Sequence, residues 1–233
     1  MPGIGTLANC VTIIIGASLG VFCKRGLPEK WQATMMNSIA LCIFIIGVQM
    51  ALKTQNIIIV IFSLVLGAIV GEILDIEAAM GRLGQHLGNK LGNGDSTASA
   101  AIAAGFVNAS ILFCSGAMAI LGSIQDGLAA DHTTLFAKAT LDGLISLILS
   151  ANLGIGVALS ALSVGIYQGS ITLLAGVVGP LVTDAMLKEI SASGGIMIMA
   201  IGCNMLKLTA IRIGNLLPGM LFAAVITLLI SYL

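Results

Sequence analysis

Ser38–Met50 reads SIALCIFIIGVQM, and Ser193–Met205, in the second half of the chain, reads SGGIMIMAIGCNM. Aligned end to end, five of the thirteen positions are identical, and Gln49 is matched by a second carboxamide, Asn204. If an odd number of membrane crossings separates the two copies, they run in opposite directions through the bilayer. Repeats of opposite orientation are typical of secondary transporters. The two stretches therefore predict an inverted repeat, although shared apolar composition alone also produces such matches.

The composition excludes an ordinary soluble domain. Hydrophobic residues make up 58% of the 233, charged residues only 9%, and the mean hydropathy is +1.10. Apolar runs recur along the chain, and about 20 apolar residues suffice to cross the ~30 Å hydrocarbon core of a bilayer. We therefore expect an all-α, polytopic integral membrane protein. A net charge of zero offers no basic surface for nucleic acid.

The hydropathy pattern predicts eight membrane spans within a single transmembrane domain, residues 1–233. A very short link, Leu162–Val164, separates the fifth span from the sixth, so seven spans would also fit. Spans 1–3 (residues 1–73) would form an N-terminal repeat and spans 6–8 (164–233) a C-terminal repeat, with helices 4 and 5 (98–163) between them. The predicted spans are Ile4–Cys23, Trp31–Leu52, Ile57–Ile73, Ala98–Gly122, Thr134–Ser160, Val164–Thr183, Ile190–Leu206 and Ile213–Tyr232.

The basic residues assign an orientation to these eight spans. Three of them, Lys53, Lys138 and Lys188, fall on one side of the membrane and seven on the other. Because Lys and Arg are enriched in cytoplasmic loops, the side with seven is cytoplasmic and both termini face outward. The seven are Lys24, Arg25, Lys30, Arg82, Lys90, Lys207 and Arg212.

The long connection between the third and fourth spans, residues 74–97, is amphipathic over Glu72–Leu91. Its apolar residues recur at spacings of three and four, and charged or polar residues fill the other face. This pattern predicts a helix that lies along the cytoplasmic surface. Such a helix could also bind a protein partner.

Asp142 is the strongest candidate for an ion or proton site, because ionisable residues are costly inside a membrane span. Lys138 lies one helical turn before it, so the two side chains can pair. Ser146 and Ser150 continue the same stripe of the helix, with Asn152 beside it. A carboxylate followed by hydroxyls offers oxygen ligands to a cation, or a path for a proton. The alternative is a structural ion pair whose neighbouring hydroxyls bond to their own backbone.

Carboxamides supply the remaining candidates for a binding site. Gln49 and Asn204 would be paired contacts near the axis of the repeat. Three others lie beside glycine or proline, which loosen helices and free backbone groups. The commonest role of such side chains is a hydrogen bond between helices. The amides at membrane depth are Asn9, Asn37, Gln49, Asn108, Gln168, Asn204 and Asn215, of which Asn108, Gln168 and Asn215 are the candidates near glycine or proline.

Motifs for enzymatic, cofactor or metal chemistry are missing from the sequence. It contains no phosphate-binding glycine loop, no H-E-x-x-H motif and no nucleophile elbow, and its five cysteines are scattered. We therefore expect no enzyme, cofactor or metal. Gly16-x-x-x-Gly20 and Gly165-x-x-x-Gly169 would allow close helix packing or a homodimer. Gln125-Asp126-Gly127 is interpreted as a turn before the fifth span.

Several short segments resemble, in order and over nearly the whole chain, those of the YqgA/YdfK-like bacterial membrane proteins, the family called domain of unknown function 554. The resemblance implies a multi-pass protein of the bacterial inner (plasma) membrane, of a kind often described as a candidate transporter. It implies no substrate and no catalytic residues. Where that family has Thr-Gly-Gly in the seventh span, this chain has Ser193-Gly194-Gly195. The matching segments are Gly71–Glu77, Gly122–Leu128, Leu141–Gly143, Tyr167–Ile171 and Gly214–Pro218.

Together these features predict a secondary transporter or channel for a small solute or ion, coupled to a cation or proton through Asp142. The alternative is a membrane scaffold or sensor that does not transport and acts through the helix Glu72–Leu91. A water-filled cavity that reaches Asp142 would favour transport, whereas a dry, fully packed Asp142–Lys138 pair would favour the scaffold.

Overall fold

The computed structural model describes residues 1–24, 29–91 and 96–231, and these fold into helices without any strand. The all-α prediction is confirmed. The elements are α1 (Ile4–Lys24), α2 (Glu29–Ala51), α3 (Ile57–Leu74), α4 (Ile76–Leu91), α5 (Ser96–Cys114), α6 (Ala117–Ala129), α7 (Thr133–Leu153), α8 (Gly156–Leu173), α9 (Ala175–Val178), η1 (Gly179–Leu181), α10 (Asp184–Met205), η2 (Ile213–Leu216) and α11 (Pro218–Ser231).

Among the described residues, six helical segments are long and apolar enough to cross a membrane, and a bent pair of helices raises the number to seven. The six are α1, α3, α7, α8, α10 and η2 with α11. The bent pair is α5 with α6, whose axes meet at 64°. The second predicted span, Trp31–Leu52, corresponds to α2, whose apolar part, Met36–Ala51, is shorter than the others. The chain is therefore a polytopic membrane protein, and its described residues give six or seven full-length spans against the seven or eight predicted.

Two predicted boundaries are wrong. The break expected at Leu162–Val164 lies earlier, because Gly154 adopts a positive φ of 75° and ends α7, whereas α8 runs unbroken to Leu173. Glycine accepts this backbone conformation without a steric penalty. The span expected over Ala98–Gly122 is not continuous, since α5 stops at Cys114 and α6 starts at Ala117.

The helices group into two compact units, and each unit draws on both halves of the sequence. The predicted division into an N-terminal repeat, two central helices and a C-terminal repeat follows the order of the chain. The two compact units do not follow that order. The first unit comprises 1–36, 79–114 and 118–180; the second comprises 37–78, 115–117 and 181–233.

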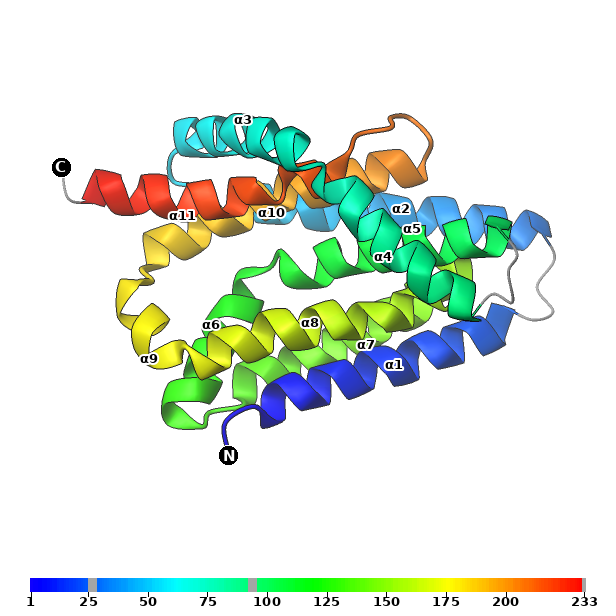
Figure 1. Cartoon of the computed structure of the whole chain (residues 1–233), viewed down its shortest axis with the longest axis horizontal. Helices are drawn as coiled ribbons and strands as arrows, with labels where there is room; N and C mark the ends of the chain where they lie inside the picture. The colour runs from blue at the N-terminus through cyan, green and yellow to red at the C-terminus, as the bar shows by residue number, and fades with distance from the viewer. Residues whose placement is uncertain (25–28, 92–95, 232–233) are drawn as a thin grey trace. The chain divides into compact units, whose positions relative to one another are not determined.

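In the first unit, α1 packs against both α7 and α8, and the three helices run side by side (Figure 1). Gly16 and Gly20 of α1 face the backbone carbonyls of Gly143 and Leu147 so closely that a Cβ at either position would collide with them. Gly5, near the start of α1, meets Leu135, near the start of α7, so the two helices run in the same direction. The Gly16-x-x-x-Gly20 motif thus does what such motifs do in membranes, bringing two helices into backbone contact.

In the second unit, α2 packs on α10 through glycines of both helices. Gly47 faces Gly195 and Met199, and Gly202 faces Ala40 and Phe44. Residues early in α2 therefore meet residues late in α10, which means that the two helices are antiparallel.

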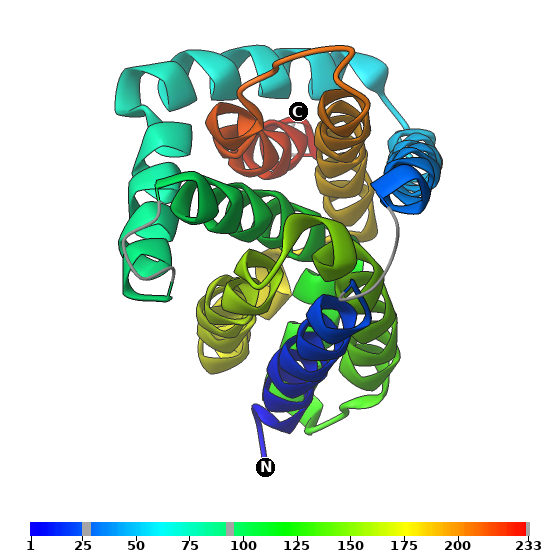
Figure 2. The same ribbon diagram turned by 90° about the vertical axis from the view of Figure 1, so that its right-hand side faces the viewer.

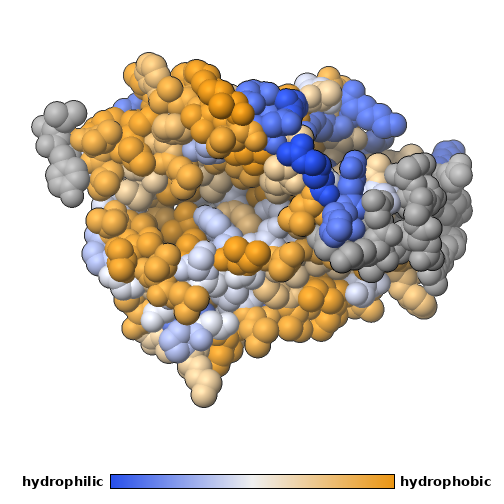
Figure 3. Space-filling view, viewed as in Figure 1, coloured by the Kyte–Doolittle hydropathy of each residue, from blue (hydrophilic) through white to orange (hydrophobic). Residues whose placement is uncertain are grey.

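α3 and α11 are also antiparallel, and they lie against each other in both views (Figures 1 and 2). Gly67 meets Gly219, and Gly71 meets the backbone of Asn215. The outward face of α3 is apolar and exposed, as the hydrophobic surface over α3 and α11 in Figure 3 shows. Burial in lipid accounts for such a face.

The amphipathic helix begins later than expected. Glu72 belongs to α3, Asp75 takes a left-handed conformation with φ 48°, and α4 starts at Ile76. Arg212 closes this corner: Nη1 lies 2.7 Å from Glu72 Oε2, and Nη2 contacts Asp75 Oδ1. The hydrogen bond that Arg212 donates to Asp75, together with the nearby carboxylates, raises the pKa of the Arg212 guanidinium. The ion pairs tie the α10–α11 loop to the end of α3.

Candidate functional site

Asp142 lies at the centre of a polar cluster in the first unit. Its Oδ2 atom accepts hydrogen bonds from Lys138 Nζ at 2.5 Å and from Asn9 Nδ2 at 3.0 Å. Asn9 Nδ2 also lies 3.4 Å from Gln168 Oε1. Three helices, α1, α7 and α8, therefore meet through one carboxylate, one ammonium and two carboxamides.

All four side chains of this cluster are buried, with 5% of Asp142, 6% of Lys138 and none of Asn9 or Gln168 exposed. Two polar atoms in it, Asn9 Oδ1 and Gln168 Nε2, have no hydrogen-bond partner among the described residues. An unpartnered buried polar group costs about 1–3 kcal/mol. The cluster therefore combines a paired charge with one free acceptor and one free donor.

The serines of the predicted stripe, Ser146 and Ser150, donate hydrogen bonds to backbone carbonyls. Ser146 Oγ donates to the carbonyls of Ile13 and Gly143, and Ser150 Oγ donates to that of Leu147. Ser146 thereby joins α7 to α1, and its contacts agree with the structural alternative for the hydroxyls. The predicted pair of Lys138 and Asp142 does form.

A groove of about 280 Å³ runs between α1 and α8 beside the cluster. Two of its lining side chains, Thr6 and Thr172, are buried and carry hydroxyls without a partner among the described residues. Gly165 and Gly169 leave the α8 side open: a Cβ would meet only the Cys10 thiol at the first and nothing within 4 Å at the second. The motif predicted to pack helices thus lines a space. The lining residues are Pro2, Gly3, Thr6, Leu7, Cys10, Gly165, Gly169, Thr172 and Leu173.

The Gln125-Asp126-Gly127 segment is part of α6 and not a turn. Asp126 is fully buried, and its two oxygens bind the backbone N–H of Gly3 at 3.1 Å and His132 Nδ1 at 2.6 Å. Gln125 Oε1 accepts a 2.6 Å bond from the Thr134 hydroxyl. The segment therefore fastens the start of α1, at the rim of the groove, to the α6–α7 loop.

Asp131 lies in that loop, outside the spans. Thr133 donates to its carboxylate, and these hydrogen bonds hold the pKa of the Asp131 carboxyl below its ordinary value. The N-cap of α7 is His132, which makes no side-chain capping bond.

The candidates in the second unit have local roles or are exposed. Gln49 is exposed on α2. Asn204 uses both ends of its amide on the loop after α10, accepting from Thr209 Oγ1 and Ile211 N and donating to the Ile211 carbonyl. The structure therefore does not join Gln49 and Asn204 as paired contacts.

Asn215 is buried and caps α4: its Oδ1 accepts from the backbone N–H of Glu77 at 2.8 Å. Its Nδ2 atom has no partner among the described residues. In the first unit, Asn108 is half-buried on α5. Of the predicted site residues, then, only Gln168 lies in the cluster with Asp142.

Sequence reasoning missed Asn9, Thr6 and Thr172 as site residues. Asn9 gave a signal, since it is an amide at membrane depth, but no neighbouring glycine or proline distinguished it. The threonines gave none, because a hydroxyl in a membrane helix ordinarily bonds to its own backbone.

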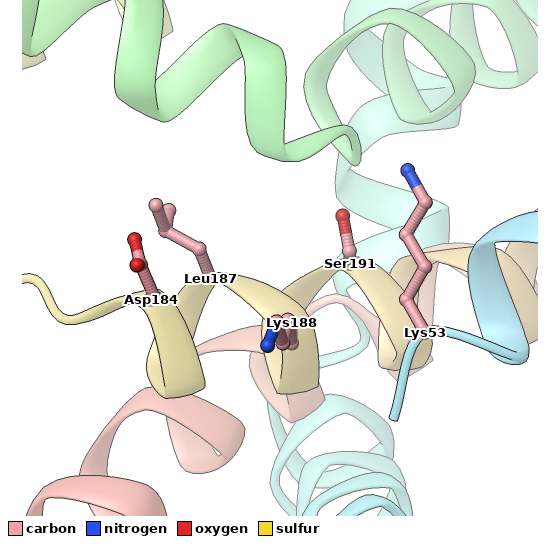
Figure 4. Close-up of a pocket in the computed structure, with 5 residues that line it drawn as sticks. All are labelled: Lys53, Asp184, Leu187, Lys188 and Ser191. Atoms are coloured by element: carbon pink, nitrogen blue, oxygen red, sulfur yellow. The ribbon is translucent and has the colours of Figure 1, made fainter. Parts of the chain in front are cut away.

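A smaller pocket, about 210 Å³, lies on α10 in the second unit. Asp184, Leu187 and Ser191 project the same way from successive turns of the helix, and Lys53 stands beside Ser191 (Figure 4). The neighbouring Glu189 is buried and fixes the α2–α3 loop, accepting bonds from Thr54, Gln55 and Asn56. The pocket offers mixed charges but no unpartnered buried atom among the described residues, so it carries no assignment.

Groups of His, Cys, Asp or Glu that could hold a metal ion are absent from the part of the chain that the structure describes. The five cysteines, including Cys10 in the groove, are free thiols.

Comparison with known proteins gives a family match over residues 4–228, to the family described as "Protein of unknown function (DUF554)". A Bacillus subtilis (strain 168) protein, "Uncharacterized membrane protein YdfK", is 32% identical over 232 residues, which is 97% of this chain and 96% of that one. An Escherichia coli (strain K12) protein, "Uncharacterized protein YqgA", is 27% identical over 221 residues, 94% of each chain. No solved structure matches.

Proposed function

We propose that this chain, which belongs to the DUF554 family, moves a small solute or ion across the membrane as a secondary transporter or channel. The observation that carries the proposal is the buried cluster of Asn9, Lys138, Asp142 and Gln168, with two polar atoms left unpartnered. Polar groups buried among apolar helices are expensive, and transporters use them to bind their cargo.

The helix packing supports an inverted repeat. Under the alignment that matches Gly47 with Gly202, Ala40 matches Gly195 and Phe44 matches Met199. Gly47 faces Gly195 and Met199, while Gly202 faces Ala40 and Phe44. Contacts exchanged between matched residues in this way are the mark of a two-fold relation.

The other two pairs of matched helices are also antiparallel. α3 is antiparallel to α11, with Gly67 against Gly219. α1 is antiparallel to α8, because Gly3 and Thr172 lie against the adjacent α6 residues Asp126 and Gly127, whereas Cys10 bonds to the Ala161 carbonyl. Inverted repeats of this kind supply the two alternative arrangements that alternating access requires.

Two glutamines offer a matched test of transport. Gln168 lies in the cluster and Gln49 is exposed on α2. Gln168→Leu should lower flux at least about tenfold, since loss of one hydrogen bond to a solute costs on the order of 1.4 kcal/mol. Gln49→Leu should leave it unchanged. The measurement is a screen of solute and ion flux in proteoliposomes. Equal flux from both variants and wild type would remove the cluster from the transport path.

The orientation, with both termini outside the bacterial inner membrane, is tested separately. His86 on α4 and Asp131 in the α6–α7 loop are both exposed. In a cysteine-free chain, a maleimide that cannot cross membranes should label Asp131→Cys in intact cells but not His86→Cys. The reverse pattern would place α4 outside and contradict the assignment by basic residues.

The alternative, a membrane scaffold that does not transport, is favoured by one observation: Lys138 and Asp142 are buried and closely paired. Such a scaffold would act through the charged face of α4. If this alternative holds, wild type shows no flux in proteoliposomes. Arg212→Met, which removes the ion pairs to Glu72 and Asp75, should then change the binding of a protein partner.

A further inference from the structure

We infer that the groove between α1 and α8 binds a small, uncharged molecule that both donates and accepts hydrogen bonds. The inference deepens the proposed function, on which it rests for the fate of the bound molecule, by naming the chemical class of the solute. It stands on the unpartnered hydroxyls, the pairing of nearby charges and the size of the groove.

The two groove threonines differ from others on the spans. Thr12, Thr140 and Thr227 donate to backbone carbonyls, as hydroxyls in membrane helices usually do. Thr6 and Thr172 are 7% and 5% exposed and have no partner among the described residues. Lipid tails cannot satisfy a hydroxyl, so an occupant that forms hydrogen bonds stabilises this arrangement better than an acyl chain.

The charged groups near the groove already have partners. Asp142 is bound by Lys138, and Asp126 by His132 and the Gly3 backbone. A charged solute would therefore give up its hydration without meeting a free counter-charge, which is costly in a low dielectric. An uncharged solute avoids this cost.

The groups left unpaired comprise both donors and acceptors. Asn9 Oδ1 can only accept and Gln168 Nε2 can only donate, whereas the hydroxyls of Thr6 and Thr172 can do both. Of these four residues only Thr6 and Thr172 line the groove, so the two hydroxyls define its hydrogen-bonding character, and Asn9 and Gln168 belong to the neighbouring cluster. A molecule with a carbonyl and an N–H or O–H group, such as a small amide, matches this set.

The size of the groove limits the solute. Its volume of about 280 Å³ lies at the lower end of the range of small-molecule pockets, about 300–1,000 Å³. The space exists because α8 carries glycine at 165 and 169. A Cβ at position 169 would have no atom within 4 Å, so a larger side chain there can extend into the groove.

Cys10 provides a readout that does not depend on transport, since its half-buried thiol lines the groove. The full chain, with its other four cysteines replaced by alanine, is reconstituted in proteoliposomes and treated with the polar, uncharged reagent 2-hydroxyethyl methanethiosulfonate. Mass spectrometry follows the rate of modification. Acetamide should slow the reaction at least about threefold, whereas acetate and ethylammonium, of similar size but charged, should not.

Two pairs of variants sharpen the test. Gly169→Leu should slow modification of Cys10 at least about tenfold, while Gly176→Leu, at a second glycine with nothing within 4 Å, should not. Thr172→Val keeps the shape of the side chain and should raise about tenfold the acetamide concentration needed for the same protection, the effect of one lost hydrogen bond on affinity. Thr140→Val, at an exposed position on α7, should leave protection unchanged.

Three results would overturn the inference. Reaction of Cys10 only with a membrane-soluble thiol reagent would mean that lipid fills the groove. Equal protection by acetate or ethylammonium would refute the uncharged class, and no protection by acetamide would refute the amide-like ligand. If Cys10 behaves as expected but wild type shows no flux above Gln168→Leu, binding stands and the proposal of transport fails. If flux depends on Gln168 while Cys10 stays inert, transport stands and this groove is not the binding site.

Discussion

Asp142→Asn should lower the free energy of unfolding by about 3–5 kcal/mol, because it leaves the Lys138 ammonium buried without its carboxylate. Only 6% of Lys138 is exposed, so water cannot replace the lost partner. Asparagine preserves the shape of the side chain and one carbonyl oxygen, which isolates the effect of charge. Denaturation of the purified protein in detergent measures the change, and Asn152→Ala, on the same helix but outside the cluster, is the control.

The double variant Lys138→Met with Asp142→Asn separates stability from function. Removing both charges leaves no unpaired ion, so the free energy of unfolding should return to within about 1 kcal/mol of wild type. If Asp142 binds a coupling cation or proton, flux should stay lower by orders of magnitude despite the recovered fold. A stable and fully active Asp142→Asn single variant would contradict both roles.

Periodicity and composition predicted much of the fold, because few backbone structures are stable in a bilayer. An apolar segment of sufficient length in lipid forms a helix, since its backbone groups find no other partners. The boundaries failed where a local conformation decided them. Gly154 ends α7 through its positive φ, but a glycine elsewhere, such as Gly16, sits inside a helix and serves packing. The sequence alone does not distinguish the two uses.

The candidate site was less accessible to sequence reasoning. The pair of Lys138 and Asp142 followed from spacing within one helix, and the structure confirms that contact. The contacts of Asn9 with Asp142 and Gln168 join residues more than a hundred positions apart, through the packing of three helices. Gln49 and Asn204 were predicted as site residues because they match in the repeat. In the structure, Gln49 is exposed on α2, and Asn204 bonds to the loop after α10.

Gly67→Ala should lower the free energy of unfolding by about 1–3 kcal/mol, because a Cβ there would overlap the backbone of Gly219 and force α3 and α11 apart. Two other glycines grade the effect. Gly219→Ala meets its nearest atoms at 3.1 Å and should cost less, whereas Gly81→Ala on α4 has nothing within 4 Å and should stabilise by up to about 1 kcal/mol through helix propensity. The same detergent denaturation measures all three. If Gly67→Ala were as stable as Gly81→Ala, the close crossing of the two antiparallel helices would be refuted, and with it one of the three matched pairs that support the inverted repeat.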